Sequence, residues 1–197
     1  MAQPINADCL TTYHAVHFGP GTRPVSDIKW IVLHDEEATT AASAAGWFTN
    51  PQSGGSAHLC VDDMLCYRTL ADTAIAWAAP GANQNGFHIE QAGYARWSLV
   101  LWRSHWKTLQ RAAFKTAYHC HKFGIPPYFV WAAGLKAGKK GVTTHAECTK
   151  AFGGDHTDPG PLWPRYAFMV MVRRYYNQLG PRSSEGVMPI PLLPQSI

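Results

Sequence analysis

The run Ile28–Leu33 is the sequence feature that most constrains the fold. Its letters, IKWIVL, are mostly apolar and include three β-branched residues, which is typical of a short strand buried inside a sheet. The run ends at His34, and an acidic stretch at 35–37 follows. The end of a buried strand is a rigid place from which a side chain can project into a cleft. The sequence therefore predicts a sheet with His34 at the end of one of its strands.

Turn and periodicity signals predict further strands and helices along the chain. The predicted strands are 57–61 and 65–70, joined as a hairpin, then 87–91 and a β-branched segment at 142–145. The predicted helices run from a cap at Thr39 or Thr40 to Phe48, from Ser104 to Phe123 and from Trp163 to Leu179. Because strands and helices interleave, the predicted fold class is α/β, a single domain with a small mixed central sheet flanked by helices.

The domain is predicted to span residues 28–180. Residues 1–27 are expected to pack on it as an N-terminal segment. Residues 181–197 contain four prolines and no periodicity, which is typical of a linker or a disordered tail.

Composition narrows the class of protein. Hydrophobic residues make up 46% of the chain and aromatic residues 12%, enough to bury a sizeable core, which excludes a disordered chain. The formal net charge of +4 is too diffuse to indicate nucleic-acid binding. No apolar run of about 18 residues occurs, so no membrane insertion is expected. The ten histidines nearly match the thirteen acidic residues in number, and this bias favours a metal site.

The N-terminal sequence and the cysteines indicate the cellular compartment in which the protein is made. Residues 1–10 have neither the basic start nor the apolar stretch of a secretory signal, so no signal peptide is expected. The five cysteines are odd in number and contain no CxxC pair, which favours synthesis in a reducing cytoplasm. Cys60 and Cys66 are the two that can meet easily, across the predicted hairpin. The sequence leaves open whether they are bridged.

Three candidate metal ligands stand out by their positions. His34 ends the buried strand, His145 follows the β-branched segment, and Asp158 lies in the turn sequence DHTDPG. Two imidazoles and one carboxylate are a usual ligand set for catalytic zinc, with a fourth position left for water. Each residue taken alone also fits a structural role, as a partly buried histidine or a turn aspartate. Residue types alone therefore leave the zinc site open.

Six motifs, in one order along the chain, carry a family resemblance. They are IVLHDEE (31–37), SAHLCVDD (56–63), AIAW (74–77), NGFHIEQAG (85–93), THAEC (144–148) and DHTDPGP (155–161). From about Ile28 to Tyr176 the chain resembles the zinc-dependent N-acetylmuramoyl-L-alanine amidases of the amidase-2 type. This family includes many phage endolysins and is related to peptidoglycan-recognition proteins. The stretches GANQNGFHIEQAG and GGDHTDPGP are most similar to endolysins of phages that infect mycobacteria and related actinobacteria.

The resemblance implies roles for five residues. It implies Zn²⁺ in a groove on one face of the sheet, with His34, His145 and Asp158 as its ligands. Glu90 matches the catalytic acid of the family's GIE motif, which takes a proton from the attacking water and passes it to the leaving nitrogen. His156 stands where many relatives carry a lysine that polarises the scissile carbonyl. A histidine near zinc can lose its proton, so its contribution is expected to depend on pH.

Four further residues are expected to bind substrate. His58 lies in the SAH motif, Trp77 matches the family's Ala-Trp pattern, Asn83 lies in a Gly/Asn-rich loop, and His88 shares a strand face with the catalytic acid. Each has a structural alternative: a strand cap for His58, the core for Trp77, a turn for Asn83, and packing or support of a zinc ligand for His88. Ala78 stands where several relatives carry histidine, which leaves fine specificity open.

Cys148 supports two rival interpretations. Its spacing from His145 allows it to replace Asp158 as the third ligand, or to act with His145 as the nucleophile of a cysteine peptidase. Relatives that use a cysteine ligand carry it later in the chain, at the position that Asp158 holds here, which favours Asp158. The sequence His119-Cys120-His121 resembles a metal motif, but on a helix such neighbours point in divergent directions. A structural role is predicted for it.

The activity implied by the resemblance is hydrolysis of the amide between N-acetylmuramic acid, or its N-glycolyl variant, and L-alanine in peptidoglycan. The protein is expected to be a monomeric phage endolysin that accumulates in the host cytoplasm and reaches the cell wall once a separate pore opens. Wall-binding or second lytic domains can follow the proline-rich tail. The alternative is a peptidoglycan-binding module without catalysis. Recognition-type relatives lose activity when the third ligand is replaced, and the presence of Asp158 favours the enzyme.

Overall fold

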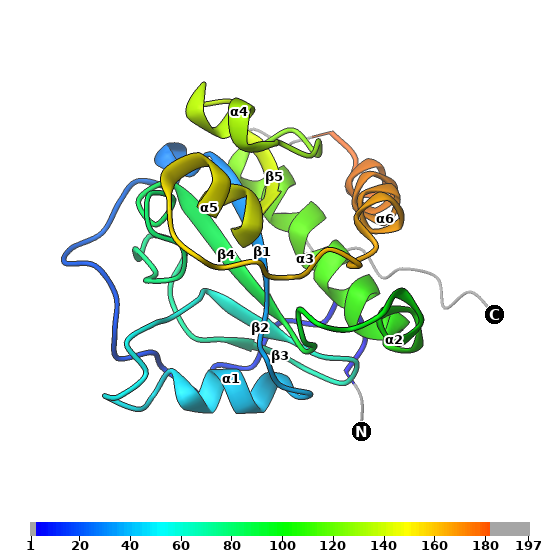
Figure 1. Ribbon diagram of the computed structural model, residues 1–197, viewed down its shortest axis with the longest axis horizontal. Helices are drawn as coiled ribbons and strands as arrows, with labels where there is room; N and C mark the ends of the chain where they lie inside the picture. Colours follow the sequence, from blue (N-terminus) through cyan, green and yellow to red (C-terminus); the bar gives the residue numbers. More distant parts are fainter. Residues whose placement is uncertain (1–2, 182–197) are drawn as a thin grey trace.

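A five-stranded mixed sheet forms the centre of the protein, of which the computed structural model describes residues 3–181 (Figure 1). The strands are β1 (Trp30–Asp35), β2 (Leu59–Val61), β3 (Cys66–Arg68), β4 (Gly86–Gln91) and β5 (Gly141–Thr144), in the order β3-β2-β4-β1-β5. The β2–β3 hairpin is antiparallel, and the other neighbouring pairs are parallel. This architecture confirms the predicted α/β domain with a small mixed sheet.

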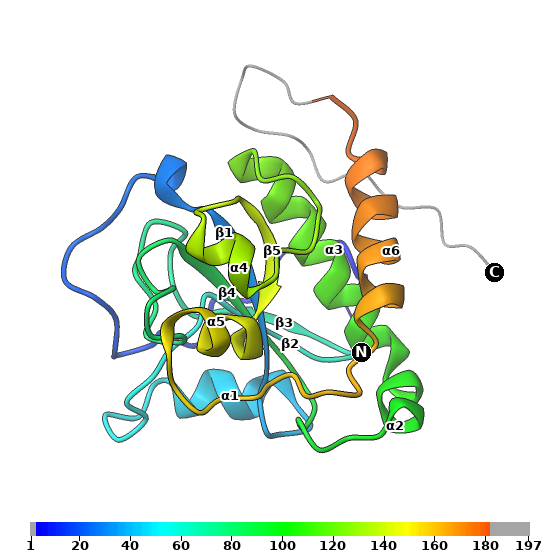
Figure 2. The same cartoon turned by 45° about the horizontal axis from the view of Figure 1, so that its top comes forward.

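Helices cover both faces of the sheet. They are α1 (Ala41–Trp47), α2 (Leu99–Ser104), α3 (Trp106–Phe123), α4 (Ala132–Lys136), α5 (His145–Phe152) and α6 (Arg165–Gln178), with a short 3₁₀ turn at Val25–Asp27 before β1. The long helix α3 packs on one face and carries α6 on its outer side. Helices α1 and α5 contact the opposite face, α1 near β2 and β3 and α5 near β1 and β5 (Figure 2).

The alternation of side chains along β1 and β4 separates the main core from the functional face. Ile31 and Leu33 of β1 point toward α3, as does Ile89 of β4, and all three are completely buried in the largest apolar cluster. His34 and Glu90 lie at the alternate positions and therefore point to the face that α1 and α5 flank. The same period-two pattern that builds the core thus directs both polar side chains away from it.

Local signals explain where the predicted helices begin and end. Thr40 caps α1, because its hydroxyl oxygen accepts a hydrogen bond of 3.3 Å from the Ser43 N–H. Gly124 ends α3 in the left-handed conformation (φ 67°), which glycine adopts without steric strain. The helix predicted from Ser104 instead begins at Trp106, because His105 leaves helical geometry. The separate helix α2, with Ser98 as its cap, precedes it.

Besides α2, two further helices lie in segments where the sequence predicts no helix. Helix α4 occupies part of the Gly/Lys-rich segment after α3. Helix α5 begins at His145, directly where β5 ends. The Thr144 hydroxyl accepts a hydrogen bond of 3.4 Å from the Glu147 N–H, which is one half of the T-x-x-E capping box. His145 therefore opens a helix, and the predicted β-branched segment ends one residue before it.

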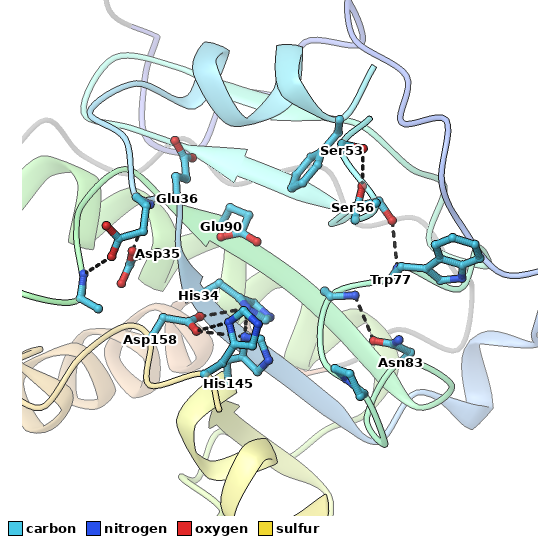
Figure 3. Close-up of a pocket in the computed structure, with 18 of the residues that line it drawn as sticks. His34, Asp35, Glu36, Ser53, Ser56, Trp77, Asn83, Glu90, His145 and Asp158 are labelled. Atoms are coloured by element: carbon cyan, nitrogen blue, oxygen red, sulfur yellow. Dashed lines mark hydrogen bonds and ion pairs between the residues drawn. The ribbon is translucent and has the colours of Figure 1, made fainter. Parts of the chain in front are cut away.

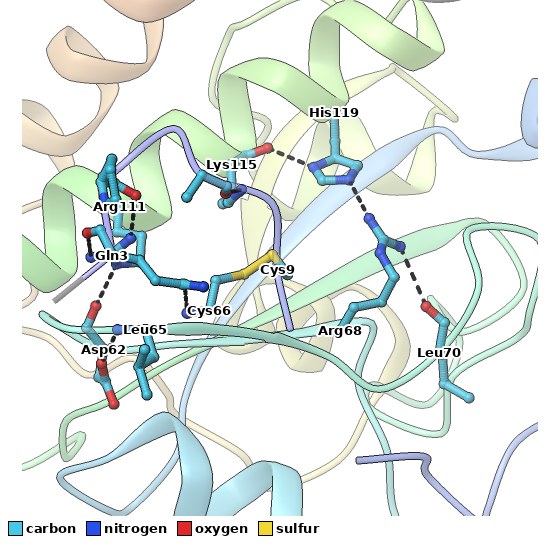
Figure 4. The surroundings of a disulfide bond; sticks show 12 residues. Gln3, Cys9, Asp62, Leu65, Cys66, Arg68, Leu70, Arg111, Lys115 and His119 are labelled. Carbon is cyan, nitrogen blue, oxygen red and sulfur yellow. Dashed lines mark hydrogen bonds between the residues drawn. A yellow bond between two sulfur atoms is a disulfide. The ribbon is translucent and has the colours of Figure 1, made fainter. Parts of the chain in front are cut away.

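The N-terminal segment lies across the β2–β3 hairpin and is fixed there by a disulfide (Figure 4). Cys9 is bonded to Cys66, and the Leu10 N–H donates to the Cys66 carbonyl at 2.8 Å. The buried guanidinium of Arg111 donates to the Pro4 carbonyl at 2.9 Å and so ties the segment to α3 as well.

The disulfide corrects the pairing that the hairpin suggested. Cys60 stands opposite Tyr67 in the ladder, while Cys66 stands opposite Val61. Cys60 and Cys66 therefore occupy adjacent ladder positions, whose side chains point to opposite faces of the sheet. Cys60 is a buried thiol on the α1 side, and Cys66 reaches Cys9 on the α3 side.

Two further predictions concern the tail and the membrane. The segment 181–197, predicted as a linker or disordered tail, lies outside the described residues apart from Pro181. Among residues 3–181, no helix has the length and apolar character needed to cross a bilayer.

Candidate metal centre and active site

His34, His145 and Asp158 converge on one point at the edge of the functional face (Figure 3). The Nδ1 atoms of the two histidines lie 3.1 Å apart. One carboxylate oxygen of Asp158 lies 3.1 Å from His34 Nδ1, and the other lies 3.0 Å from His145 Nδ1. Both histidines are buried and Asp158 is nearly so. The two Nδ1 atoms thus lie 3.1 Å apart, and each has a different carboxylate oxygen of Asp158 at a similar distance.

This cluster of two imidazoles and one carboxylate has the size and chemistry of a metal site. Bonds of about 2.0–2.2 Å to a tetrahedral zinc ion place neighbouring ligand atoms about 3.3–3.5 Å apart, close to the observed spacing. Burial lowers the pKa of His34. Burial also acts to raise the pKa of Asp158, but hydrogen bonds with His145 and His34 outweigh it and hold that pKa below its ordinary value. A carboxylate beside neutral imidazoles is the protonation state that binds a divalent cation.

Three different parts of the fold supply these ligands. His34 is the last residue but one of β1, and His145 is the first residue of α5. Asp158 lies in the loop that leads to α6, and its carbonyl accepts a 2.9 Å hydrogen bond from the Ala146 N–H in the first turn of α5. Gly160 lets this loop pass close to the backbone of Ala95, because any side chain at this position would collide with the Ala95 carbonyl.

A pocket of about 810 Å³ opens in front of the three ligands, and Glu90 lies in its wall. Glu90 is 8% exposed, and its Oε2 is buried with no hydrogen-bond partner within residues 3–181. Burial, reinforced by the negative charges of Asp158 and Asp35, raises the pKa of Glu90 well above its ordinary value. A carboxyl group of this kind is suited to accept and return a proton during a reaction.

His156 lies at the rim of the pocket, above the ligands. Its ring stacks on that of His145, with centroids 4.2 Å apart, and its Nδ1 is 3.6 Å from an Asp158 oxygen. The side chain is 61% exposed. This position allows a ring N–H to face a substrate that enters the pocket.

Trp77 and Asn83 line the same pocket at its far end from Asp158 (Figure 3). The indole of Trp77 is 44% exposed, and His17 of the N-terminal segment stacks beside it at 5.6 Å. The side-chain oxygen of Asn83 accepts hydrogen bonds from the Ala78 and Ala79 N–H groups, at 3.0 and 2.6 Å. That oxygen shapes the loop, so only the rest of the Asn83 side chain is left to contact a ligand.

His58 and His88 are placed differently from the other predicted substrate-binding residues. Both are 0% exposed and lie beneath the pocket rather than in its lining. His58 bonds within the protein, and burial lowers its pKa to about 3. His88 contacts the ring of His34. Substrate contact is therefore the wrong role for both, because a ligand in the pocket cannot reach them.

Asp35 and Glu36 are further carboxylates of the pocket wall, and no role was predicted for either from the sequence. Burial raises the pKa of Asp35 to about 7 and that of Glu36 well above its ordinary value. Together with Glu90 they give the pocket an acidic wall beside the ligands. The available signal was their position in the sequence, directly after His34 at the end of a buried strand.

The structure gives the competing cysteine and histidine motifs structural roles. Cys148 is completely buried in an apolar cluster under α5, and burial raises the pKa of its thiol to about 12, which does not suit a nucleophile. His119 and His121 are both buried, and they hydrogen-bond to different carbonyls, of Lys115 and Gly180.

Comparison with known proteins agrees with this geometry. Residues 24–161 match the family model of N-acetylmuramoyl-L-alanine amidase (Amidase_2). The match covers most of the chain, and the protein belongs to this family. Comparison with curated protein sequences gives no match.

Solved structures of a hydrolase, an endolysin and an amidase share this fold. The hydrolase AmiA of Staphylococcus aureus, in complex with its ligand, superimposes with a TM-score of 0.66 at 17% identity, covering 89% of this chain and 88% of that one. A mutant endolysin from Bacillus subtilis superimposes with a TM-score of 0.54 at 20% identity, and the alignment covers 83% of this chain and 99% of that one. The N-acetylmuramoyl-L-alanine amidase LysC of Clostridium intestinale superimposes with a TM-score of 0.53 at 14% identity, and the alignment covers 83% of this chain and 99% of that one. Family and fold together support a hydrolase that acts on peptidoglycan amides.

Proposed function

We propose that this protein is a zinc-dependent amidase that cleaves the bond between N-acetylmuramic acid, or its N-glycolyl variant, and the L-alanine of the stem peptide. The observation that carries the proposal is the convergence of His34, His145 and Asp158 at the pocket that also holds Glu90. Two imidazoles and one carboxylate leave a coordination position open, as catalytic zinc sites do.

Hydrolysis of an amide needs a stronger nucleophile than water, a polarised carbonyl and a protonated leaving group. A zinc ion at the three ligands would polarise the carbonyl and lower the pKa of water from 15.7 to about 7. Glu90 takes the proton from the attacking water and delivers it to the departing nitrogen of L-alanine, without which the tetrahedral intermediate collapses back. Its enclosed Oε2 and raised pKa support this role.

His156 is the group best placed to stabilise the negative charge that develops on the scissile oxygen. Its ring stacks on His145 at the pocket rim and is still exposed to a ligand. A well-directed donor to such an oxygen contributes about 3 kcal/mol to transition-state stabilisation. Trp77 offers an exposed aromatic surface on which a sugar or peptide group can stack.

We also propose that the enzyme acts as a phage endolysin in host lysis. The support is the resemblance of two motifs to endolysins of phages that infect mycobacteria, together with the fold shared with an endolysin. We propose that the protein accumulates in the host cytoplasm with Cys9 and Cys66 still reduced, and that it needs a separate pore to reach the wall. Expression in a mycobacterial cytoplasm should leave the cells intact until the membrane is permeabilised. Lysis without permeabilisation, or no lysis after it, contradicts this role.

The activity is tested on purified peptidoglycan, by mass spectrometry of the released fragments and by labelling of new amino termini. The proposal predicts that free L-alanine amino termini appear while the glycan strands stay intact. A chelator should stop the appearance of these termini, and added zinc should restore it. Binding to the wall without new amino termini contradicts the amidase and supports the binding-module alternative. Release that persists after complete removal of metal contradicts the zinc mechanism.

A further inference from the structure

His88 lies directly behind the metal ligand His34, on the same face of the sheet. In the β1–β4 ladder it stands opposite Val32, two residues before His34, so both imidazoles project toward the site face. The His34 Nε2 and His88 Nδ1 atoms are 3.0 Å apart, within hydrogen-bond distance. The His88 side chain is completely buried and has no access to the pocket.

The position of the proton on each ring follows from the role of His34. Its Nδ1 faces His145 and Asp158, so this atom must offer its lone pair to a metal. The proton of the neutral His34 ring then lies on Nε2 and is donated to His88. His88 therefore accepts through Nδ1 and carries its own proton on Nε2.

A second layer of contacts fixes His88 in this orientation. Its backbone N–H donates to His58 Nδ1 at 3.1 Å, so His58 carries its proton on Nε2 and donates it to the Ala74 carbonyl, also at 3.1 Å. The His58 and His88 rings are stacked, with an interplanar angle of 11°. Arg23 holds the start of this strand, since its Nη2 donates to the Gly86 carbonyl at 2.7 Å.

Gly86 provides the space that the His88 ring occupies. A Cβ at position 86 would lie 2.6 Å from His88 Nε2 and 2.8 Å from the Ala82 carbonyl oxygen. The backbone of Gly86 is ordinary strand, so glycine is required here for room and not for an unusual φ. His88 Nε2 is itself buried with no hydrogen-bond partner in the described part of the chain. A buried unpaired N–H is unfavourable, so stability alone does not explain a histidine at this position.

We propose that His88 is a positioning residue for metal binding: it accepts the Nε2 proton of His34 and so directs the Nδ1 lone pair of His34 toward the metal. Gly86 serves the same purpose by making room for the His88 ring. This inference rests on the proposed metal site. Partners that accept the outer proton of a ligating histidine orient the ring and strengthen its basicity, and their loss weakens metal affinity about 10- to 100-fold.

The test compares two substitutions that differ in one property. In His88→Asn the side-chain oxygen can take the place of Nδ1 as acceptor, whereas His88→Leu has a similar bulk and no acceptor. Zinc affinity is measured by competition with a chromogenic chelator, and the melting temperature is measured separately on the metal-free proteins. We expect His88→Leu to lose about 10- to 100-fold in zinc affinity and His88→Asn to stay close to the parent.

Two further variants separate positioning from general packing. His119→Leu removes another fully enclosed histidine, on the α3 side, and is the matched control. It should change the metal-free melting temperature and leave zinc affinity unchanged. Gly86→Ala keeps His88 but displaces its ring, and it should lower zinc affinity in the same direction as His88→Leu.

The outcomes distinguish this inference from the proposed function. Equal zinc affinity in the parent and His88→Leu overturns the positioning role, as does an equal loss in His88→Asn and His88→Leu. If the parent binds zinc and releases no L-alanine amino termini, the amidase proposal fails while the positioning role stands. If the parent binds no zinc, the metal site and the positioning role fail together.

Discussion

His34 and Glu90 are Cα partners in the parallel ladder between β1 and β4. Partners in register project to the same face, so strand pairing alone sets the metal ligand beside the carboxyl group that handles protons. A slip of one residue would turn Glu90 toward α3 and into the apolar core. The relative position of the two groups is therefore as rigid as the centre of the sheet.

Substitution Glu90→Gln should lower kcat by about 10²- to 10⁴-fold, because the amide keeps the shape of the side chain and cannot take up a proton. Zinc content should not change, since Glu90 is not among the three converging ligands. Release of L-alanine amino termini and metal content are measured on the same preparation. Glu37→Gln, at the pocket rim and paired with Arg96, is the control. Near-parental turnover in Glu90→Gln contradicts the proton-transfer role.

Zinc should stabilise the parent protein and not Asp158→Asn, because the neutral amide is a poor ligand for the ion. By mass action, free zinc at 100 times its dissociation constant adds about 2.7 kcal/mol to the free energy of unfolding. Urea unfolding with and without zinc measures the difference. Asp155→Asn removes a neighbouring carboxylate that is fully exposed, and its response to zinc should equal that of the parent. An equal response in Asp158→Asn would show that the ion binds elsewhere.

Trp77→Ala should raise KM for soluble muropeptides with a smaller change in kcat, because the indole lines the pocket away from the reacting groups. Trp47→Ala is a matched control: its side chain is 49% exposed, against 44% for Trp77, and it lies outside the pocket lining. Steady-state kinetics of the two variants are compared. If Trp77→Ala and Trp47→Ala raise KM equally, the loss of any exposed indole explains the increase, and Trp77 makes no specific contact with substrate.

Acid should destabilise the fold through its buried histidines. Burial, together with the charge of Arg68, lowers the pKa of His119 to about 3, whereas an unfolded histidine has a pKa of about 6.5. Between these values the unfolded chain binds a proton that the folded protein does not, so stability falls as pH decreases from about 6.5 toward 3. His58 contributes in the same direction.

His119→Gln removes one of these titrations and should make the fall in stability shallower, by up to about 1.4 kcal/mol per pH unit. The measurement is urea unfolding between about pH 7 and 5, with a chelator present so that metal release does not contribute. His14→Gln, at an exposed histidine, should keep the slope of the parent. If the free energy of unfolding depends on pH equally in the parent and in His119→Gln, protonation of His119 is not a cause of the acid destabilisation.

Reduction of Cys9–Cys66 should lower the free energy of unfolding. The bond joins residues 57 positions apart, and in the chain-entropy model a loop of that length corresponds to about 4 kcal/mol at 25 °C. We expect a loss of about 2–4 kcal/mol on addition of a reductant, and no further effect of the reductant on Cys9→Ser. Parent protein that is equally stable with and without the reductant contradicts a stabilising disulfide.

The sequence predicts the elements whose signals are local. The apolar, β-branched run around Ile31 identifies β1. The helical period identifies the buried face of α3, and Gly124 marks its end. The start of α5 could also have been predicted, since Thr144 and Glu147 form the T-x-x-E pattern of a helix cap. The side chain of His145 is the first in that helix, which the strand prediction did not show.

Relationships between distant segments could not be derived from spacing. Cys9 reaches Cys66 only because the N-terminal segment crosses the hairpin, and Asp158 reaches His34 only through the folded chain. The family resemblance named the three ligands where spacing alone left them open. The burial of His58 and His88 was missed because a polar residue in a strand looks the same whether it lines a pocket or supports a neighbour from beneath.

An anomalous difference map, recorded at the zinc absorption edge from crystals of the zinc-loaded protein, tests the proposed zinc site most directly. We expect one strong peak within about 2.0–2.2 Å of the Nδ1 atoms of His34 and His145 and of a carboxylate oxygen of Asp158. A map without a peak at this position, or with the ion held by other side chains, contradicts a zinc site at these three residues.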